Sequence, residues 1–364
     1  MLIETIEISL KQVRKKTQAI RFILKQNQSL RDILFTDDKE VIKKAAELKL
    51  NLSENSISTT EWKIYEHSAV VVQLYATYEN FVEELISKWV DALPQLVTKY
   101  DQLEEVIRKN HRIGVGKLIS TFGENKYDLK LDQIIQGLSD GINKNSTYKL
   151  IPESFLINCQ NNLRQGELKK LFGYVGLTEF ESGWKWLKHH QNVKEYIDNI
   201  LGESNILENQ LDLFIEYRNA SAHSLVPEND SLGYDSLLNW CDFVDAMCQA
   251  LADLLMYHFL KKKLTINEAK KIGEITNYYP NKKVLTASVN SVTLSLEDTI
   301  FIVNVNQESS YCKAARIREL RNKNEQSKQS LRIRKEQNIS IQIDIINAIK
   351  PPKKTYEIYI LTPI

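Results

Sequence analysis

The sequence from Ser58 to Trp89 is STTEWKIYEHSAVVVQLYATYENFVEELISKW, and it predicts a strong helix around which the fold is built. Ser58 and Glu61 have capping-box spacing, in which the serine hydroxyl caps the first turn and the glutamate reaches back to the serine N–H. Pro94 predicts that the helix stops or kinks there. The apolar face is wide, which predicts burial against several partner helices and not a two-helix seam. It consists of Ile64, Val71, Val72, Tyr75, Tyr78, Phe81, Val82, Leu85, Ile86 and Trp89.

On both sides of this stretch, helical patterns extend from the N-terminus to about residue 270. An apolar series at near-helical spacing predicts a first amphipathic helix. It consists of Ile3, Ile6, Ile8, Val13, Ile20, Ile23 and Leu24. The last helix ends in Lys261, Lys262 and Lys263, cations that suit the negative end of a helix dipole. We predict a short helix and a loop at 37–58, a loop-rich middle at about 110–160, and helices near 163–172, 207–217 and 235–263.

From about Tyr278 onward the apolar residues alternate and many are β-branched, which predicts short strands. The predicted strands are 284–286, 289–294, 300–305, 311–320, 339–345 and 356–361. The fold class is therefore a multi-domain α and β chain, with an all-α helical bundle followed by a small all-β barrel. We expect the helical domain at 1–270, with its core at about 60–260, and the barrel at 275–364. The boundary is expected between Ile266 and Asn277.

The composition is that of an ordinary globular protein, with 43% apolar and 26% charged residues. The four cysteines are scattered, with no Cys-x-x-Cys pair, which argues against a zinc knuckle or a disulfide framework and fits a reducing compartment. The first residues lack the basic and apolar regions of a secretion signal. No apolar run reaches the roughly 18 residues of a membrane span. We expect a cytoplasmic protein with no membrane segment, no metal and no cofactor.

The net charge of +1 conceals an asymmetry. Between Lys313 and Lys354 there are 12 Lys or Arg residues and four Asp or Glu residues. A basic segment on an otherwise acidic chain is a possible electrostatic footprint for a polyanion. A solvated strand-and-loop face explains the same pattern equally well.

The sequence Arg218-Asn219-Ala220-Ser221-Ala222-His223 is the candidate for chemistry. It lies where one predicted amphipathic helix ends and the next is due. An arginine offers a permanently charged planar fork to phosphate oxygens. A histidine can act as general base or acid near neutral pH. An adjacent amide can orient the phosphate or hold the histidine in one tautomer. The alternative is structural, with Arg218 paired to Glu216 or another acidic helix and His223 a core histidine.

In this setting, Arg-Asn-x-x-Ala-His resembles the signature of HEPN domains, many of which are ribonucleases of defence and toxin systems. The run Ser68 to Phe81 is similar to an early helix of a bacterial HEPN subfamily that carries a leucine-tyrosine-alanine, aromatic, glutamate pattern. The resemblance covers roughly residues 60–260. It departs from the pattern in the long insert between the two helices and in Ser224, where a glycine often follows the histidine.

The resemblance implies a HEPN-like helical domain that acts as a metal-independent endoribonuclease, in which the 2′-hydroxyl of the RNA attacks. It implies that Arg218 stabilises the scissile phosphate, His223 transfers protons and Asn219 positions one or the other. It also implies a homodimer with a composite active site, RNA targets such as tRNA or ribosomal RNA, and a role in phage defence or a toxin system. An antitoxin or sensor protein is a further expected partner. The rival interpretation is a non-catalytic dimeric module that binds RNA or protein.

The segments 295–303 and 315–320 are similar to the second-domain barrel of translation GTPases, although Glu297-Asp298 departs from the glycine-aspartate pair of that barrel. This similarity implies docking of RNA or a protein partner through the barrel. The alternative is a domain that only supports the fold or the dimer. The candidate RNA-binding residues are Arg316, Arg318, Arg321, Arg332 and Arg334.

Several other motifs favour structural interpretations. Gly114-Val115-Gly116-Lys117 lacks the remaining residues of a P-loop and predicts a turn. His189-His190 has no accompanying metal-ligand cluster and predicts a surface helix. Trp184 and Trp186 could stack on bases, but so dense an aromatic stretch favours packing in the core. Three glutamates on the predicted central helix, Glu79, Glu83 and Glu84, favour a solvated helix face. The alternative is that this face borders the cleft of the composite active site.

Overall fold

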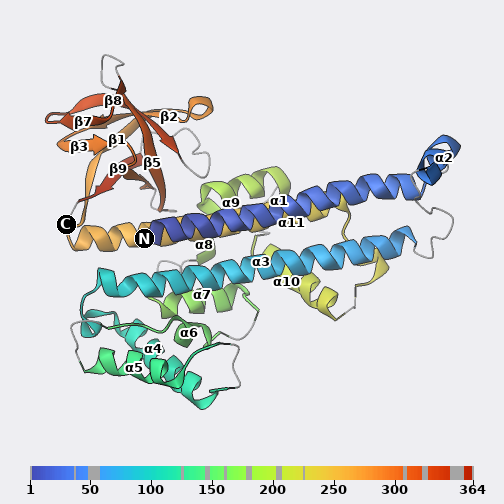
Figure 1. The fold of residues 1–364 in the computed structure, drawn as a ribbon, viewed down its shortest axis with the longest axis horizontal. Helices are drawn as coiled ribbons and strands as arrows, with labels where there is room; N and C mark the ends of the chain where they lie inside the picture. The colour runs from blue at the N-terminus through green and yellow to red at the C-terminus, as the bar shows by residue number, and fades with distance from the viewer. Residues whose placement is uncertain are drawn as a thin grey trace.

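The structure is a computed structural model, and it describes residues 2–36, 38–47, 58–123, 127–143, 148–159, 162–177, 183–201, 207–223, 226–305, 310–321, 327–344 and 356–362. Helices occupy the N-terminal part, and an antiparallel β domain follows them, as the fold class predicts. Figure 1 shows the long helices lying side by side and the strands gathered at one end, near both termini of the chain.

The central helix α3 (Thr59–Leu96) begins where the capping box predicts. The Glu61 N–H donates to the Ser58 hydroxyl at 3.1 Å, and the Ser58 N–H donates to the Glu61 carboxylate at 2.7 Å. Pro94 lies in the last turn, and the helix ends two residues later. Most of the apolar face is buried as expected, with Tyr75, Tyr78 and Trp89 each about 1% exposed, whereas Val72 is 39% exposed. This wide face contacts α1, α10 and α11, so the prediction of several partner helices is confirmed.

Helices α1 (Leu2–Leu34) and α11 (Tyr234–Thr265) pack against each other and against α3. Polar side chains fix their register, since the Thr17 hydroxyl donates to Asp245 at 2.9 Å and Arg21 donates to Asp245 at 3.0 Å. Ile8 and Ile23 belong to the apolar series that predicted α1, yet each is 53% exposed. The buried stripe of α1 is therefore narrower than the sequence suggests.

Helix α11 is, among the described residues, the one helix long and apolar enough to cross a membrane by length and composition alone. Its qualifying window is 89% buried inside the protein. Neighbouring helices therefore cover the apolar surface of α11, and it serves as the central core helix.

The middle of the chain is helical, so the prediction of a loop-rich region at about 110–160 is wrong. The elements there are η1 (Tyr100–Gln102), α4 (Glu105–Ser120), α5 (Leu131–Ile142), α6 (Pro152–Leu156) and α7 (Gln165–Tyr174). The segment 114–117, predicted as a turn, lies within α4. A Cβ on Gly114 would stand 1.6 Å from the Ser154 carbonyl oxygen, so the absence of a side chain lets α6 approach the α4 backbone. Glycine here serves helix packing.

Three short helical segments lead to the last helices of the bundle. They are α8 (Gly183–His189), α9 (Gln191–Tyr196) and the π-helical turn η3 (Ile197–Leu201). Helix α10 (Leu207–Ala222) and the 3-10 turn η5 (Glu228–Asp230) come before α11. The polar segment after α1 contains the expected short helix, α2 (Lys39–Glu47).

The C-terminal strands form a closed antiparallel barrel. Six strands close the barrel, and each of them pairs with two of the other five. Their circular order is β4, β9, β1, β2, β8, β5 and back to β4. Their bounds are β1 (Ala269–Tyr279), β2 (Val284–Val289), β4 (Thr299–Asn304), β5 (Tyr311–Arg321), β8 (Gln337–Asp344) and β9 (Tyr356–Leu361). The short β6 (Ser327–Lys328) pairs antiparallel with the end of β5. Strand β3 (Val292–Ser295) pairs with β7 (Ser330–Ile333) in a separate two-stranded sheet. Strand β1 begins nine residues before Tyr278, where the sequence pattern first suggested strands.

A buried polar cluster joins the barrel to the helices. The His190 imidazole lies 3.1 Å from an Asp253 carboxylate oxygen on α11, and the Lys313 ammonium on β5 lies 3.5 Å from the same oxygen. His190 is 0% exposed, so the prediction of a surface helix is wrong for this residue. Trp186 is buried as predicted and donates to the Ser310 carbonyl at 2.9 Å. The barrel is thus held by specific polar contacts as well as by apolar packing.

Candidate functional site

The hexapeptide is helical, which the sequence did not predict. Residues 218–222 form the last turns of α10, and His223 follows as a turn residue. The His223 N–H donates to the Asn219 carbonyl at 3.2 Å, so the two residues stand one helical turn apart. The other side of α10 is anchored in the core by Leu211, Phe214 and Ile215, which are all 0% exposed. The hexapeptide therefore rests on a rigid support.

Arg218 is half-buried and lies against α3. Its guanidinium carbon is 5.0 Å from the centre of the Tyr75 ring, and one guanidinium nitrogen donates to the Asn219 side-chain oxygen at 3.0 Å. Its contacts among the described residues are this ring and this amide. The structural alternative offers Glu216 or another acidic helix as the partner, and no ion pair between Arg218 and Glu216 occurs in the described part of the chain. The aromatic face supports the cation without neutralising its charge.

Asn219 connects three parts of the site. Its side-chain oxygen accepts from Arg218 and also from the Asn162 side-chain amide at 3.1 Å. Two donors fix which way the amide faces, so its NH₂ group points away from them. Asn162 lies 57 residues earlier in the sequence, and no motif marks it. Sequence reasoning missed it because only the fold brings the two residues together.

The Tyr75 side chain lies beneath Arg218, and its hydroxyl contacts two further groups. It accepts from the Leu163 N–H at 3.0 Å and lies 3.2 Å from a Glu79 carboxylate oxygen. Burial raises the pKa of Tyr75 well above its usual value, and the nearby Glu79 carboxylate acts in the same direction. The phenol therefore stays protonated and serves to position its neighbours. Glu79 is half-buried and bonded to this hydroxyl, so it does border the site.

His223 is exposed, and Ala222 beside it is exposed as well. The alternative of a buried core histidine at position 223 is therefore wrong. Asn219 and Arg218, one turn earlier, lie at the edge between core and surface. The hexapeptide thus presents an imidazole to solvent beside an amide and a guanidinium that are held in place. Ser224 lies outside the described residues.

His67 anchors the chain that follows the hexapeptide. It is 0% exposed, its Nδ1 accepts from the Leu232 N–H at 2.9 Å, and its ring meets the edge of Tyr217 at a centroid distance of 5.3 Å. Burial lowers the pKa of His67, so its ring is neutral at pH 7. It ties the connection between α10 and α11 to α3, and so fixes the direction in which α10 ends.

No group of three His, Cys, Asp or Glu side chains that could hold a metal ion occurs within the part of the chain that the structure describes. All four cysteines are free. Burial raises the pKa of the Cys159 thiol to about 11 and that of Cys241 to about 12, so neither is a thiolate nucleophile at pH 7.

The five candidate RNA-binding arginines differ in their surroundings. Arg316 lies 3.5 Å from Glu4 of α1, and Arg318 contacts Glu297 at 2.5 Å. These two barrel cations are therefore engaged by carboxylates. Arg321 pairs with Glu319 at 2.9 Å, and Asp344 is a second partner of Arg318 at 3.0 Å. Arg332 and Arg334 are exposed, at β7 and directly after it.

Comparison with known proteins gives one family match. The family model described as RiboL-PSP-HEPN matches residues 36–257. No curated protein matches the chain. Among solved structures, a match is the C-terminal domain of a protein from Geobacillus thermoleovorans described as a U32 peptidase. It is 11% identical, covers 25% of this chain and 91% of that one, and has a TM-score of 0.19.

Proposed function

This chain belongs to the RiboL-PSP-HEPN family, and on that premise we propose that it is a metal-independent endoribonuclease whose active site is the hexapeptide at the end of α10. The observation that carries the proposal is the exposed His223 one turn after Asn219, whose amide oxygen is fixed by Arg218 and Asn162. An RNA-cleaving site needs a proton-transfer group open to substrate and a cation held beside it.

The reaction needs only groups that RNA and these residues supply. The 2′-oxygen attacks the adjacent phosphorus while a base takes its proton. The bond from phosphorus to the 5′-oxygen breaks, and an acid protonates that oxygen. The products are a 2′,3′-cyclic phosphate and a 5′-hydroxyl. His223 transfers protons, Arg218 stabilises the extra negative charge of the phosphorane, and Asn219 positions the arginine or the phosphate.

One imidazole per chain is sparse for a reaction that needs both a base and an acid. We therefore propose a homodimer in which two hexapeptides face each other and form a composite cleft. The position of the hexapeptide at the exposed end of α10 supports this arrangement, because a second copy can approach it.

The proposed division of labour assigns cleavage to residues 1–270 and docking of RNA to the barrel at 275–364. The proposed setting is a cytoplasmic phage-defence or toxin system acting on tRNA or ribosomal RNA. Control by an antitoxin or sensor protein is part of the same proposal. These cellular roles rest on the family, whose HEPN domains are associated with ribonucleases.

The test is cleavage of total RNA by the purified full chain in the presence of EDTA. We expect the wild type to cut, and Arg218→Ala and His223→Ala each to lower the rate about 100-fold or more, the usual contribution of a proton-transfer or charge-stabilising group. New 5′ ends should accept labelled phosphate directly from polynucleotide kinase, because they carry a hydroxyl.

The matched controls are His189→Ala, which removes an exposed histidine on α8, and Arg112→Ala, which removes an exposed arginine on α4. Both should cut like the wild type. Intact RNA with the wild type, or equal cutting by the Arg218 and His223 variants, would overturn the catalytic assignment and leave a non-catalytic binding module.

A further inference from the structure

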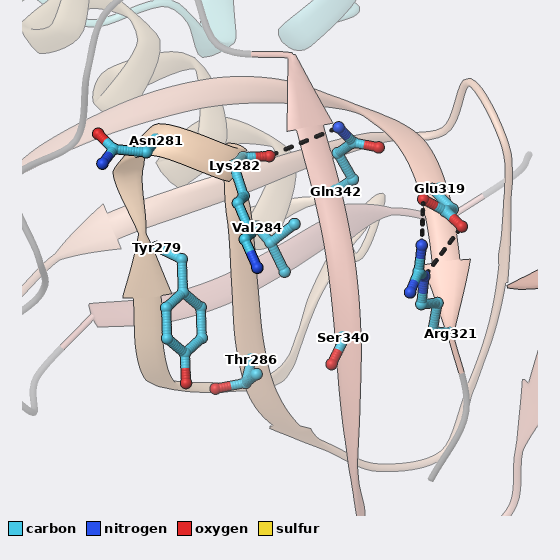
Figure 2. A pocket seen from close by; sticks show the side chains of 9 residues that line it. All are labelled: Tyr279, Asn281, Lys282, Val284, Thr286, Glu319, Arg321, Ser340 and Gln342. Carbon is cyan, nitrogen blue, oxygen red and sulfur yellow. Dashed lines mark hydrogen bonds and ion pairs between the residues drawn. The ribbon is translucent and has the colours of Figure 1, made fainter. Parts of the chain in front are cut away.

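A hollow of about 670 Å³ lies on the outer wall of the barrel, far in sequence from the hexapeptide on α10. Figure 2 shows its lining side chains on β1, β2, β5, β8 and the turn after β1. Strand alternation explains why they face outward, since Leu285 and Ala287 point into the barrel core while the alternating Val284 and Thr286 are half-exposed. Such a volume is within the range of small-ligand sites, roughly 300–1,000 Å³.

The turn η6 (Pro280–Lys282) builds one wall of the hollow. Lys283 has a left-handed backbone, with φ of 51°, which reverses the chain from this turn into β2. Figure 2 shows the Lys282 side chain running alongside Val284, beside the Tyr279 ring. The turn thus places an exposed ammonium and an aromatic ring on the same side of the hollow.

The opposite wall carries Arg321, which is paired with Glu319 through two nitrogens at 2.9 and 3.3 Å. The charged residues that line the hollow are Lys282, Arg321 and Glu319, and their formal charges sum to +1. Arg316 and Arg318 lie on the same strand as Arg321 but contact carboxylates outside the hollow, Glu4 and Asp344 among them. The hollow is therefore a place where part of the basic segment faces a cavity.

Tyr279 supplies a flat apolar surface at the rim. It is 47% exposed, and its hydroxyl accepts from the Asn277 side chain at 3.1 Å, which holds the ring in one orientation. Stacking on an aromatic ring is the usual way in which proteins bind unpaired bases without choosing a sequence. Amide and hydroxyl groups, from Asn281, Ser340 and Gln342, complete the lining and can bond base edges and 2′-hydroxyls.

We propose that this hollow binds one or two nucleotides of single-stranded RNA. A base stacks on Tyr279, Lys282 and Arg321 contact the phosphates, and the Ser340 hydroxyl and Gln342 amide on β8 bond the base edge or the ribose. The inference rests on the proposed function, since RNA is the substrate there. It adds a second contact with the same substrate, made by the barrel and separate from the cleavage site.

The test measures binding without cleavage. The full chain carrying His223→Ala is titrated against a fluorescein-labelled 12-nucleotide single-stranded RNA, and binding is followed by fluorescence anisotropy. In this background we expect Tyr279→Ala to weaken binding about 5- to 30-fold, the usual effect of losing one stacked base. Lys282→Glu should weaken it about 5- to 10-fold and reduce its dependence on salt.

The matched control is Lys270→Glu, the same charge reversal on the exposed start of β1. It lies nine residues before Tyr279 on β1, a path of roughly 30 Å along the strand at about 3.3 Å per residue. It should leave the affinity within about twofold, because at that distance surface charges are screened. A duplex of the same sequence should bind more weakly than the single strand, since its bases cannot stack on Tyr279.

Equal losses in the Lys282 and Lys270 variants, or unchanged binding by Tyr279→Ala, would overturn the inference. A loss confined to Arg332→Glu would also overturn it, because RNA would then follow β7 instead. These binding results do not depend on whether the wild type cuts RNA. A failure of the proposed nucleotide site in the barrel can therefore be distinguished from a failure of the proposed catalytic site.

Discussion

At the scale of single residues, the orientation of Arg218 depends on side chains outside any motif. Tyr75 lies beneath its guanidinium, and Asn162 shares the Asn219 oxygen with it. The hydroxyl of Tyr75 in turn holds the Leu163 N–H, next to Asn162. The site is therefore a small hydrogen-bonded unit in which a cation rests on a buried phenol.

Tyr75→Phe separates the two roles of this residue. We expect it to lower the free energy of unfolding by about 1–3 kcal/mol, because the buried Leu163 N–H loses its acceptor. The ring remains under Arg218, so the folded variant should cut RNA within about threefold of the wild-type rate. Urea unfolding and initial cleavage rates provide the two measurements.

Tyr78→Phe is the matched control, since the Tyr78 hydroxyl is buried with no hydrogen-bond partner among the described residues. Removing a hydroxyl that makes no bond should cost little or even stabilise the fold. If both variants unfold at the same urea concentration, the Leu163 bond does not contribute as stated here.

At the scale of elements, helix α4 shows how packing overrides helix propensity. Gly114 and Gly116 weaken the helical pattern in the sequence. In the structure Gly114 meets the Ser154 backbone of α6, whereas a Cβ on Gly116 would have nothing within 4 Å. The same residue type is thus required at one position and merely tolerated two residues later.

The two glycines predict opposite effects of the same substitution. Gly114→Ala should lower the free energy of unfolding by more than about 3 kcal/mol, because α6 must move away to accept the methyl group. Gly116→Ala should raise it by about 0.5–1 kcal/mol, since alanine favours the helix and meets no neighbour. Urea unfolding of both variants checks the signs, and a stable Gly114→Ala protein would contradict the close approach.

Much of the fold could be predicted because its signals are local. The Ser58–Glu61 capping box, the apolar face of α3 and the alternation of β2 lie within single elements. The middle helices were missed because their glycines are explained only by contacts with other segments, as at Gly114 and Ser154. The hexapeptide was found by its spacing, but Asn162 and the support from Tyr75 arise from tertiary contacts that no local pattern contains.

At the scale of the whole molecule, one carboxylate joins the two parts of the chain. Asp253 of α11 contacts His190 and Lys313, and Gln249 donates to its other oxygen at 2.5 Å. Burial lowers the pKa of His190, so its ring is neutral and Lys313 is the cation that faces the carboxylate. The barrel is therefore coupled to the helices through a charge pair that is almost wholly removed from water.

Asp253→Ala should lower the free energy of unfolding by about 3–5 kcal/mol, because it leaves the Lys313 ammonium buried without its counter-charge. The link between α11 and β1 should also become sensitive to limited proteolysis. The control is Asp242→Ala on the same helix, where the Asp242 side chain is 49% exposed and pairs with Arg21. This substitution should lower the free energy of unfolding by less than about 1 kcal/mol. Equal effects of the two substitutions would show that the junction contributes no special coupling.

The pairing of α1 with α11 has a consequence for the order in which the protein is made. Thr17 finds Asp245 only after 228 further positions have been translated, and α3 needs both helices to cover its apolar face. Helix α1 must therefore wait for α11 before its buried face is covered. Because α10 is seated on the same bundle, the support of the hexapeptide in a nascent chain stays incomplete until α11 has been made.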